Sequence, residues 1–315
     1  MGLFTQLKEK IFPSQFPMVG VDISEASIEL LQLQPGEDKP SIKSAARLEL
    51  KPGLMAKGKI KDLDYVADIL STAYSQASPA FSSKLCLLSL PDRYTYFLNL
   101  QVATLATEQK ILEQAQAKLP LDLKQCYFDY QLVERQAEHE RIFFVAAEKD
   151  LVSQYLQIFN KTSLNLAVID FESASLARSL ATDLTAPTFI VDLGAESTDI
   201  VLLDKNGFRD QTNICLGGRN LTASISENLK IDSVEAENMK KVEGFNLKQG
   251  NLNTILPEVL QPIIEEIKKI QKNYEASSGQ RVKTIVLAGG TSLLPGLKDF
   301  FVSKLQNFPP LSSFP

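Results

Sequence analysis

The sequence predicts an α/β protein built from two similar halves, and three observations lead to this class. From Met18 onward, strand-like apolar runs alternate with runs of helical periodicity, as they do in α/β architecture. Two strand–turn–strand segments share the same pattern of residue types and lie 170 positions apart, one at Asp22 and the other at Asp192. The chain has 315 residues, 44% of them hydrophobic, which allows about two domains with cores of their own.

The composition excludes several classes of function. Thirty-three basic and thirty-eight acidic residues leave a net charge of −5, so we expect no basic face for nucleic acid. The three cysteines are far apart in the sequence, and the single histidine, His139, lies in a charged stretch. A disulfide framework, a zinc site and a Ser-His-Asp triad are therefore not expected. No apolar run approaches the roughly 20 residues of a membrane-spanning helix, and a reducing cytoplasm is the predicted location.

An N-terminal segment, residues 1–16, precedes the first predicted strand. Its apolar residues fall mostly on one face of a helix: Leu3, Phe4, Leu7, Ile11 and Phe12. Such an amphipathic segment can lie on a membrane surface or dock on a partner. A short capping helix or a frayed tail is the simpler interpretation.

The first half opens with a predicted three-stranded meander and a helix. We expect the strands at residues 18–23, 27–33 and 41–50, and the helix at 62–73. The pattern then repeats on a smaller scale, with predicted strands at 85–90, 94–102, 127–133, 142–147 and 164–169 and helices at 107–118 and 150–159. We interpret residues 84–164 as a compact α+β subdomain inserted into a first lobe of residues 17–83 and 165–186.

The second half repeats the meander and adds a long helical part. We expect strands at residues 188–193, 199–203 and 208–216, a largely helical stretch at 219–273, a strand at 284–287 and a helix at 297–305. The tail, residues 307–315, carries three prolines and is predicted to be a loop or frayed end. The second lobe is thus predicted at 187–218 and 274–315, with a helical subdomain at 219–273.

The two matching hairpins are predicted to bind phosphate. Their sequences, VDISEASIEL from Val21 and VDLGAESTDI from Val191, share an Asp at the strand end, a small residue two positions later and a Ser five positions later. A tight turn of small residues points backbone N–H groups and a hydroxyl into one concavity that can hold a polyphosphate. The candidate phosphate-binding residues are Asp22, Ser24, Glu25, Ala26, Ser27, Gly194, Ala195, Glu196, Ser197 and Thr198.

Two further features suggest a magnesium nucleotide. Asp22 and Asp192 can hold the waters around Mg²⁺, because Mg²⁺ prefers carboxylates and retains much of its water. Glycine pairs let backbone approach a purine or ribose closely, and an acid and a base three residues apart on a helix can contact ribose hydroxyls and adenine. An ordinary surface ion pair would have the same spacing. The candidate nucleoside-binding residues are Gly217, Gly218, Glu237, Lys240, Gly289, Gly290 and Thr291. Two hairpins facing each other would clamp one nucleotide in a cleft.

In the order of these motifs the chain resembles the actin-like ATPase superfamily of actin, sugar kinases and heat-shock chaperones. GVDISEAS resembles the first phosphate loop, VDLGAEST the second, and LAGGTSLLPGL the adenosine motif. Residues 105–120 and the segments YFDY, FVAA and VID resemble the small SHS2-like subdomain that PilM and FtsA carry and that actin and the sugar kinases lack. Over residues 18–301 the chain is most similar to the PilM family of type IV pilus assembly.

The resemblance implies an α/β, actin-like ATPase fold with two duplicated lobes (subdomains 1A and 2A), a helical subdomain (2B) and an inserted small α+β subdomain (1C). It implies ATP and Mg²⁺ between the lobes, with weak or no turnover. It also implies a cytoplasmic scaffold at the inner membrane that docks the cytoplasmic tail of a PilN-like protein, in a groove between the insert and the first lobe. Other pilus platform and motor proteins, and a second copy of the chain, are further expected partners.

Three positions depart from the superfamily pattern. Ser24 stands where many members have glycine, and its side chain can crowd the γ-phosphate or add a hydroxyl contact. Glu172 lies near the position of the residue that orients water; it can act as a base, but a helix N-terminal residue favoured by the dipole is the interpretation we prefer. The segment after the adenosine helix is short, so we expect less cover over the second lobe.

Two other functions stay open at this level. A small-molecule kinase of the same superfamily would need a general-base Asp and a substrate pocket in the first lobe, and neither is evident. An FtsA-like, membrane-associated division or filament protein would use a C-terminal amphipathic helix, whereas the amphipathic candidate here lies at residues 1–12.

Overall fold

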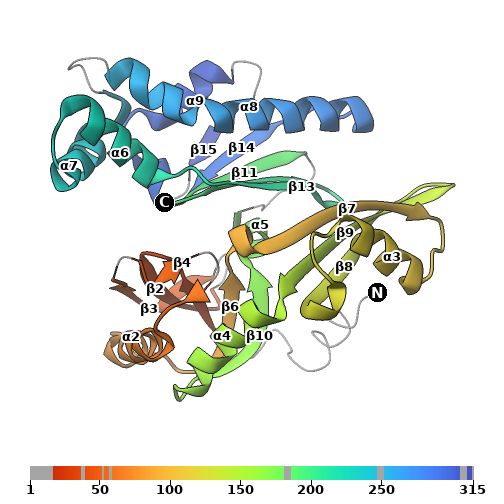
Figure 1. The fold of residues 1–315 in the computed structure, drawn as a ribbon, viewed down its shortest axis with the longest axis horizontal. Coiled ribbons are helices and arrows are strands. Elements are labelled where there is room, and N and C mark those ends of the chain that lie inside the picture. The colour runs from red at the N-terminus through yellow and green to blue at the C-terminus, as the bar shows by residue number, and fades with distance from the viewer. Residues whose placement is uncertain are drawn as a thin grey trace. The chain divides into compact units, whose positions relative to one another are not determined.

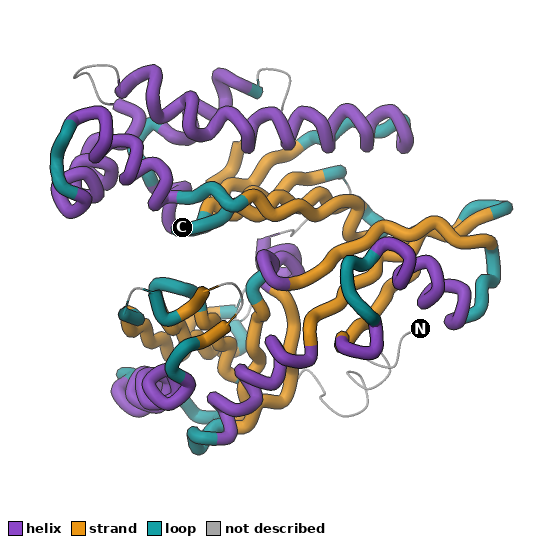
Figure 2. The backbone as a smooth tube through the Cα atoms, viewed as in Figure 1, coloured by secondary structure: helices purple, strands orange, loops and turns teal. Residues whose placement is uncertain are grey.

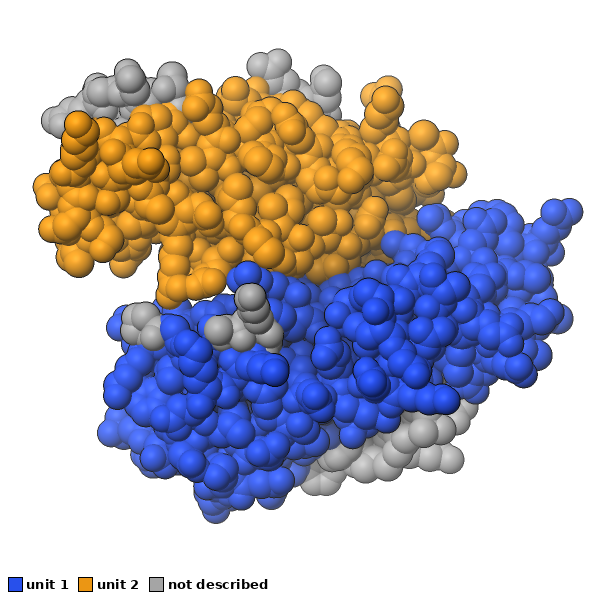
Figure 3. All heavy atoms as spheres, viewed as in Figure 1, with its two compact units in different colours: residues 1–175 blue, residues 176–315 orange. Residues whose placement is uncertain are grey.

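The computed structural model describes residues 17–36, 40–51, 53–56, 59–180, 186–246, 252–305 and 311–313. The chain divides into two compact units, unit 1 (residues 1–175) and unit 2 (residues 176–315), coloured separately in Figure 3. The predicted amphipathic segment, residues 1–16, lies outside the described residues. The two units divide at 175/176, and the lobes are predicted to divide at 186/187.

A five-stranded sheet with the order β10-β6-β1-β2-β3 forms the centre of unit 1 (Figure 1). Its strands are β1 (Val19–Ile23), β2 (Ser27–Gln34), β3 (Ser41–Glu49), β6 (Leu85–Leu90) and β10 (Asn165–Phe171). β1, β2 and β3 form an antiparallel meander, and β6 and β10 continue the sheet in parallel from β1. Alternate residues of β1, Val19, Val21 and Ile23, are buried, which is the period-2 pattern of a strand with one face on the core.

Two helices cover that buried face. They are α2 (Leu63–Gln76) and α4 (Lys149–Asn160), and their buried residues recur at helical spacing. Asp62 begins α2, because its side chain accepts a hydrogen bond from the Tyr65 amide. The short strands β4 (Met55–Ala56) and β5 (Lys59–Ile60) pair beside them.

A separate antiparallel sheet, ordered β7-β9-β8, forms the inserted part of unit 1. It consists of β7 (Thr95–Ala103), β8 (Cys126–Arg135) and β9 (His139–Glu148), with α3 (Glu108–Lys118) and the 3-10 turns η1 (Asp92–Tyr94) and η2 (Leu123–Gln125). Leu100, Ile111 and Phe144 share a core between this sheet and α3. Phe97 of β7 contacts Phe171 at the end of β10 with ring centroids 5.0 Å apart.

The elements within the predicted insert, 84–164, pack in two different places. β6 belongs to the first sheet, because it pairs with β1 on one side and β10 on the other. α4 packs into the core of that same sheet through Tyr155 and Ile158. The separate sheet therefore runs only from Thr95 to Glu148.

Unit 2 repeats the sheet connectivity of unit 1, as the predicted duplication requires. Its sheet has the order β13-β12-β11-β14-β15, with a meander on one side of the central strand and two parallel strands on the other. The strands are β11 (Thr188–Leu193), β12 (Thr198–Asp204), β13 (Gly207–Ile214), β14 (Thr284–Ala288) and β15 (Leu311–Ser313). β15 lies in the tail that was predicted to be a loop.

Helices cover one face of this second sheet (Figure 2). They are α6 (Gly218–Leu229), α7 (Ser233–Glu243), α8 (Leu252–Ser278) and α9 (Leu297–Lys304), with the 3-10 turns η3 (Gly244–Asn246) and η4 (Gly290–Leu293). On the other face Leu176, Ala177 and Leu180 of α5 (Glu172–Leu180) pack against the sheet, so residues predicted in the first lobe group with unit 2. Within the described ranges no helix has both the length and the apolar character that crossing a bilayer requires.

The three cysteines differ in exposure. Cys86 on β6 and Cys126 on β8 are buried, whereas Cys215, just after β13, is exposed. Burial raises the pKa of the Cys86 thiol to about 12. All three are free thiols.

Candidate functional site

The two Asp-containing hairpins have the same backbone hydrogen bond at their turns. Between β1 and β2, the Ser24 amide donates to the Ser27 carbonyl at 3.0 Å. Between β11 and β12, the Gly194 amide donates to the Ser197 carbonyl, also at 3.0 Å. The sequence offset of 170 therefore corresponds to a repeated local structure.

The register of the strands repeats with the same offset. Asp22 pairs with Glu29 across β1 and β2, and Asp192 pairs with Asp199 across β11 and β12. Each Asp lies near the carboxyl end of the central strand of its sheet. In open α/β sheets, ligands bind outside the carboxyl ends of the strands.

Three chain segments of unit 2 meet at the second hairpin. The Gly194 carbonyl accepts from the Gly218 amide and from the Thr291 hydroxyl, both at 2.9 Å. The Ala195 carbonyl accepts from the Arg219 amide at 2.8 Å. The start of α6 and the glycine turn after β14 are thereby fixed against the hairpin, and the structure brings these predicted site residues of unit 2 together.

Close approach explains the glycines in this cluster. A Cβ at Gly217 would lie 2.7 Å from the carbonyl of Ala195. At Gly289, which has φ +80°, a Cβ would meet the Asp192 carboxylate and lie 2.6 Å from the Leu193 carbonyl. No side chain fits at either position without displacing backbone. Gly290, in contrast, has open space where a Cβ would be.

Asp192 is a half-buried carboxylate without a counter-charge in its surroundings. Within the described part of the chain it accepts no hydrogen bond and pairs with no cation. Burial raises the pKa of Asp192 to about 6, because desolvation disfavours the charged form. A hydrated Mg²⁺ would supply the missing positive charge, and a single carboxylate with water suits that ion. The residues therefore fit the metal that was predicted here.

Lys240 of α7 makes three hydrogen bonds within unit 2. Its ammonium donates to the Gly218 carbonyl and the Thr222 hydroxyl at 2.9 Å each, and to the Glu237 carboxylate at 2.6 Å. An ammonium has three donors, so each has a protein acceptor. Lys240 is only 5% exposed, and it joins α6 to α7.

Glu237 stays ionised in this arrangement. Burial alone would raise the pKa of Glu237, but hydrogen bonds from Lys240 and Thr222 and the charges of Lys240 and Lys241 outweigh it and lower the pKa. Glu237 is thus held as a carboxylate at the edge of a cavity.

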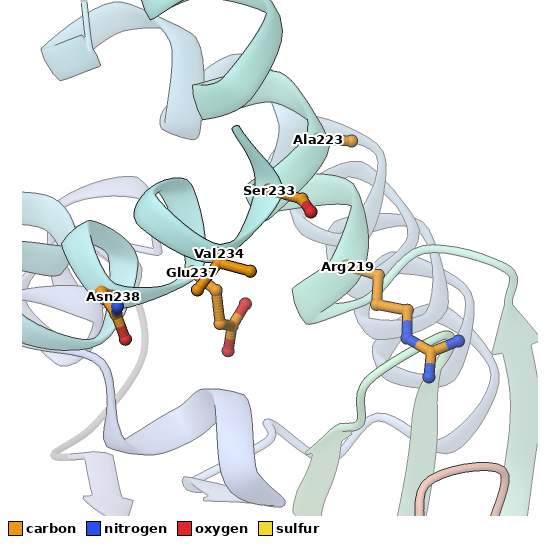
Figure 4. A pocket seen from close by; sticks show the side chains of 6 residues that line it. All are labelled: Arg219, Ala223, Ser233, Val234, Glu237 and Asn238. Atoms are coloured by element: carbon orange, nitrogen blue, oxygen red, sulfur yellow. The ribbon is translucent and has the colours of Figure 1, made fainter. Parts of the chain in front are cut away.

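That cavity has a volume of about 520 Å³ and lies between α6 and α7. In Figure 4, Glu237 and Val234 of α7 face the pocket, with Arg219 at the start of α6 on its other side. The lining residues are Arg219, Ala223, Ser233, Val234, Glu237 and Asn238. The volume is in the range of small-molecule pockets. Of the lining residues only Glu237 was predicted.

In the first hairpin, unlike the second, a side chain of the turn accepts hydrogen bonds from backbone amides. The Ser24 hydroxyl accepts from the Ala26 amide at 3.3 Å and from the Ser27 amide at 3.1 Å. The Ser27 hydroxyl donates to the Glu29 carboxylate at 3.1 Å. Both hydroxyls of the turn are therefore engaged within the hairpin itself.

Acidic residues gather near this hairpin in unit 1. The hydroxyl of Tyr155 is buried without a hydrogen-bond partner in the described structure. Its pKa is raised well above the usual value, first by burial and then by the charges of Glu172, Asp22 and Glu25. These predicted site residues thus share one electrostatic environment.

Glu172 is the first residue of α5, and its carboxylate accepts from the Asp92 amide at 3.3 Å. Asp92 is buried and accepts from both the amide and the hydroxyl of Ser173. Glu172 and Asp92 together tie the start of α5 to η1. This contact favours the helix-start interpretation of Glu172 over a base.

Comparison with known proteins shows to which family the chain belongs. The model of the type IV pilus assembly protein PilM matches residues 20–309. The chain belongs to the PilM family. This confirms the resemblance that its motifs predicted.

Relatives of this PilM-family chain fix its fold. The PilM-PilN type IV pilus biogenesis complex is similar with a TM-score of 0.77 at 20% identity, over 96% of this chain and 91% of that one. MreB 5 of Spiroplasma citri bound to AMPPNP has a TM-score of 0.57 at 13% identity, over 96% and 92%. The PilM-family chain therefore has the predicted actin-like ATPase fold.

Cell division protein FtsA of Bacillus subtilis (strain 168) is 28% identical over 139 residues. The match covers 38% of this PilM-family chain and 32% of FtsA, so the chain spans about a third of that curated relative's length.

Proposed function

We propose that this chain is a nucleotide-binding scaffold of the type IV pilus assembly platform. The observation that carries the nucleotide part is the cluster in unit 2, where a hairpin, the start of α6 and a glycine turn meet beside Asp192. The PilM family membership carries the pilus part. A similar solved protein, MreB 5, is bound to AMPPNP, which supports a nucleotide as the ligand class.

The phosphates belong beside the second hairpin in this proposal. The backbone N–H groups of Ala195 and Ser197 donate to no acceptor among the described residues, and small turns of this kind bind anions. Asp192 would hold Mg²⁺ through water within unit 2, and Asp22, at the equivalent end of β1, is the corresponding candidate within unit 1. The ion, when bound, supplies charge compensation for the phosphates and for Asp192.

The nucleoside belongs in the cavity between α6 and α7. The Glu237 carboxylate can accept hydrogen bonds from ribose hydroxyls, and Val234, which is 69% exposed, offers an apolar contact to a base. Lys240 supports this pocket indirectly, because its ammonium holds Glu237 in place. The glycines at 217, 218, 289 and 290, with Thr291, form the adjoining wall.

Turnover of ATP is proposed to be weak or absent. Glu172, the candidate base, is engaged with the Asp92 amide at the start of α5. The nucleotide then acts as a structural or switching ligand of the scaffold.

The partner that we propose is the cytoplasmic tail of a PilN-like protein at the inner membrane. One similar solved structure is a complex of PilM with PilN. Within unit 1, the inserted sheet contacts the first sheet through Phe97 and Phe171, and its edge strand β8 exposes Tyr127 to 54%. The tail is proposed to lie in the groove between these two parts. Through this partner, and with other platform and motor proteins, the chain would associate peripherally with the membrane.

The family match favours this scaffold over the two alternatives that the sequence left open. The similarity to FtsA covers 38% of the chain, whereas the PilM family model matches residues 20–309. A sugar-type kinase finds no added support in unit 1.

Titration calorimetry with ATP and Mg²⁺ tests the nucleotide part. We expect Mg²⁺-dependent binding that Asp192→Ala removes, whereas the control Asp299→Ala, an exposed carboxylate on α9 of the same unit, leaves it unchanged. Wild-type affinity in Asp192→Ala would overturn the assignment of the site.

Pull-down with a PilN-type cytoplasmic peptide, with and without ATP, tests the partner. We expect capture of the full chain by the peptide. The variant Tyr127→Asp should weaken capture, and Val242→Asp, a similarly exposed apolar residue on α7 of unit 2, should not. Equal capture by both variants would exclude the groove beside β8.

A further inference from the structure

We propose that Arg219 is a phosphate-binding residue and that Glu196 competes with the phosphate for its guanidinium. A nucleotide that enters the site in unit 2 would then replace one ion pair, between Arg219 and Glu196, by another, between Arg219 and a phosphate. The inference rests on the proposed nucleotide-binding function and adds a ligand residue and an internal competitor to it. All the residues that carry it belong to unit 2.

Arg219 touches both parts of the proposed site. It lines the cavity between α6 and α7, on the side opposite Glu237 (Figure 4). Its backbone amide donates to the Ala195 carbonyl at 2.8 Å, which fixes its main chain beside the turn of the second hairpin. Its guanidinium pairs with Glu196, a residue of that same turn. The nucleoside is proposed for the cavity and the phosphates for the turn, so Arg219 lies where the two meet.

The ion pair between Arg219 and Glu196 is of a kind that a ligand can replace. Nη1 of Arg219 donates to the Glu196 carboxylate, and the two side chains are 49% and 29% exposed. Ion pairs that water reaches contribute little net stability, because both charges are well solvated when apart. A guanidinium has five N–H donors, and within the described ranges the other four have no protein acceptor. Most of the binding capacity of Arg219 is therefore open to a ligand.

A phosphate offers Arg219 more than the carboxylate does. Arginine binds carboxylates and phosphates in the same way, through two parallel N–H groups, so Glu196 stands where a phosphate can stand. The amides of Ala195 and Ser197, on either side of Glu196, donate to no acceptor among the described residues. A phosphate at this turn would accept from these amides as well. Adenosine, which carries no phosphate, gains nothing from the exchange.

Lys240, the cation that anchors Glu237, cannot take this role. Its three donors are bonded to the Gly218 carbonyl, the Thr222 hydroxyl and the Glu237 carboxylate. A phosphate that recruited this ammonium would leave polar groups around a buried lysine unpaired, which is costly. The positive side chain that can turn to a phosphate without such a loss is Arg219.

Calorimetric titration of the full chain with ADP·Mg²⁺ and with adenosine tests the inference. Arg219→Ala should weaken ADP binding at least about tenfold and change adenosine binding less than about twofold. Glu196→Gln removes the competing charge at nearly constant shape, and should tighten ADP binding about threefold to fivefold. The matched controls are Arg281→Ala, exposed just before β14, and Glu227→Gln, exposed on α6, and both should keep the wild-type affinity.

The double variant Arg219→Ala/Glu196→Gln separates competition from simple repulsion. Competition requires the arginine, so Glu196→Gln should change ADP affinity less than about 1.5-fold once Arg219 is alanine. The unpaired Glu196 carboxylate is then screened by solvent. If the full tightening persisted in the double variant, Glu196 would act by repelling the phosphates directly, and the competition would be overturned.

The outcomes separate the inference from the function on which it rests. Wild-type ADP affinity in Arg219→Ala would leave a surface ion pair only and overturn the inference, while the nucleotide site stands. Equal losses for ADP and adenosine would make Arg219 a contact of the nucleoside, and would also overturn it. Absence of binding in the wild type would overturn the nucleotide function itself. Arg219→Lys keeps the charge but not the planar fork, should weaken ADP binding about threefold, and serves in place of an Arg219→Ala that fails to fold.

Discussion

The turns at the carboxyl ends of the two central sheets are closed, that is, held by hydrogen bonds, in different ways. In unit 1, side chains close the turn region: the Ser24 hydroxyl accepts two amides, and Asp92 accepts from Ser173. In unit 2, backbone closes it: the amides of Gly218 and Arg219 donate to carbonyls of the second hairpin. A side-chain closure opens with one change of rotamer, whereas a backbone closure is fixed by the course of the chain. The binding cluster proposed within unit 2 is therefore preformed.

The largest effect on this comparison is expected at Gly289. Gly289→Ala introduces a Cβ at φ +80° against the Leu193 carbonyl and the Asp192 carboxylate, so strain and overpacking should destabilise the fold by about 4 kcal/mol. Chemical denaturation measures this. The neighbouring Gly290→Ala has open space and should cost less than about 0.5 kcal/mol. Similar losses in the two variants would show that the turn is not closed by backbone contact.

The next effect is expected at Lys240. Lys240→Ala removes a buried ammonium from Glu237, Thr222 and the Gly218 carbonyl, and should lower the free energy of unfolding by about 3 kcal/mol. Lys241→Ala is the matched control, because that lysine also pairs with Glu237, at 3.4 Å, but is 66% exposed. We expect less than about 0.5 kcal/mol there. If urea denaturation gave equal losses, Lys240 would be an ordinary surface charge.

A smaller, pH-dependent effect is expected at Asp192. Its pKa of about 6 lies above the unfolded value, so the folded state binds this proton more tightly. The resulting stability is complete below about pH 4 and is lost as the pH rises through about 6. Asp192→Asn should therefore be about 2 kcal/mol more stable than wild type at pH 7.5 and equal to it at pH 4.

Denaturation of both proteins between pH 4 and 8 measures that difference. Added Mg²⁺ at pH 7.5 should stabilise the wild type and leave Asp192→Asn unchanged, because only the carboxylate attracts the ion. If the difference in stability between the two proteins were constant across the pH range, the burial of Asp192 would not be its cause.

The smallest effect is expected at Glu172. Glu172→Gln keeps an acceptor for the Asp92 amide, so stability should change by less than about 1 kcal/mol, and any residual ATP turnover should stay at the wild-type level. A phosphate-release assay with Glu172→Gln checks this. A loss of turnover without a loss of stability would restore Glu172 as a base.

The repeated hairpins could be predicted because their signal is local. The strand period, the terminal Asp and the small residue two positions later are all contained in ten residues, and the register at Asp22 and Asp192 follows from them. The fold class and the family resemblance follow from the order of such motifs, and the comparisons confirm both. The predicted site residues themselves await the binding experiments.

Pairing between distant segments could not be predicted in the same way. The apolar alternation of β6 is the same whether it joins the first sheet or the insert, so the sequence alone does not predict its pairing with β1 and β10. The spacing of Glu237 and Lys240 predicts that they share one helical face. It does not predict the direction in which the ammonium of Lys240 points. Arg219, Val234 and Asn238 were missed because their role depends on how α6 packs against α7.

The exposure of Cys215 has a practical consequence. It lies two residues before Gly217, at the start of the segment that closes the second hairpin, while the Cys86 thiol, with a pKa of about 12, is inert at neutral pH. A maleimide dye would therefore label the unmodified protein at one place, beside the predicted nucleoside wall. Its fluorescence would report ligand entry in real time without an engineered cysteine.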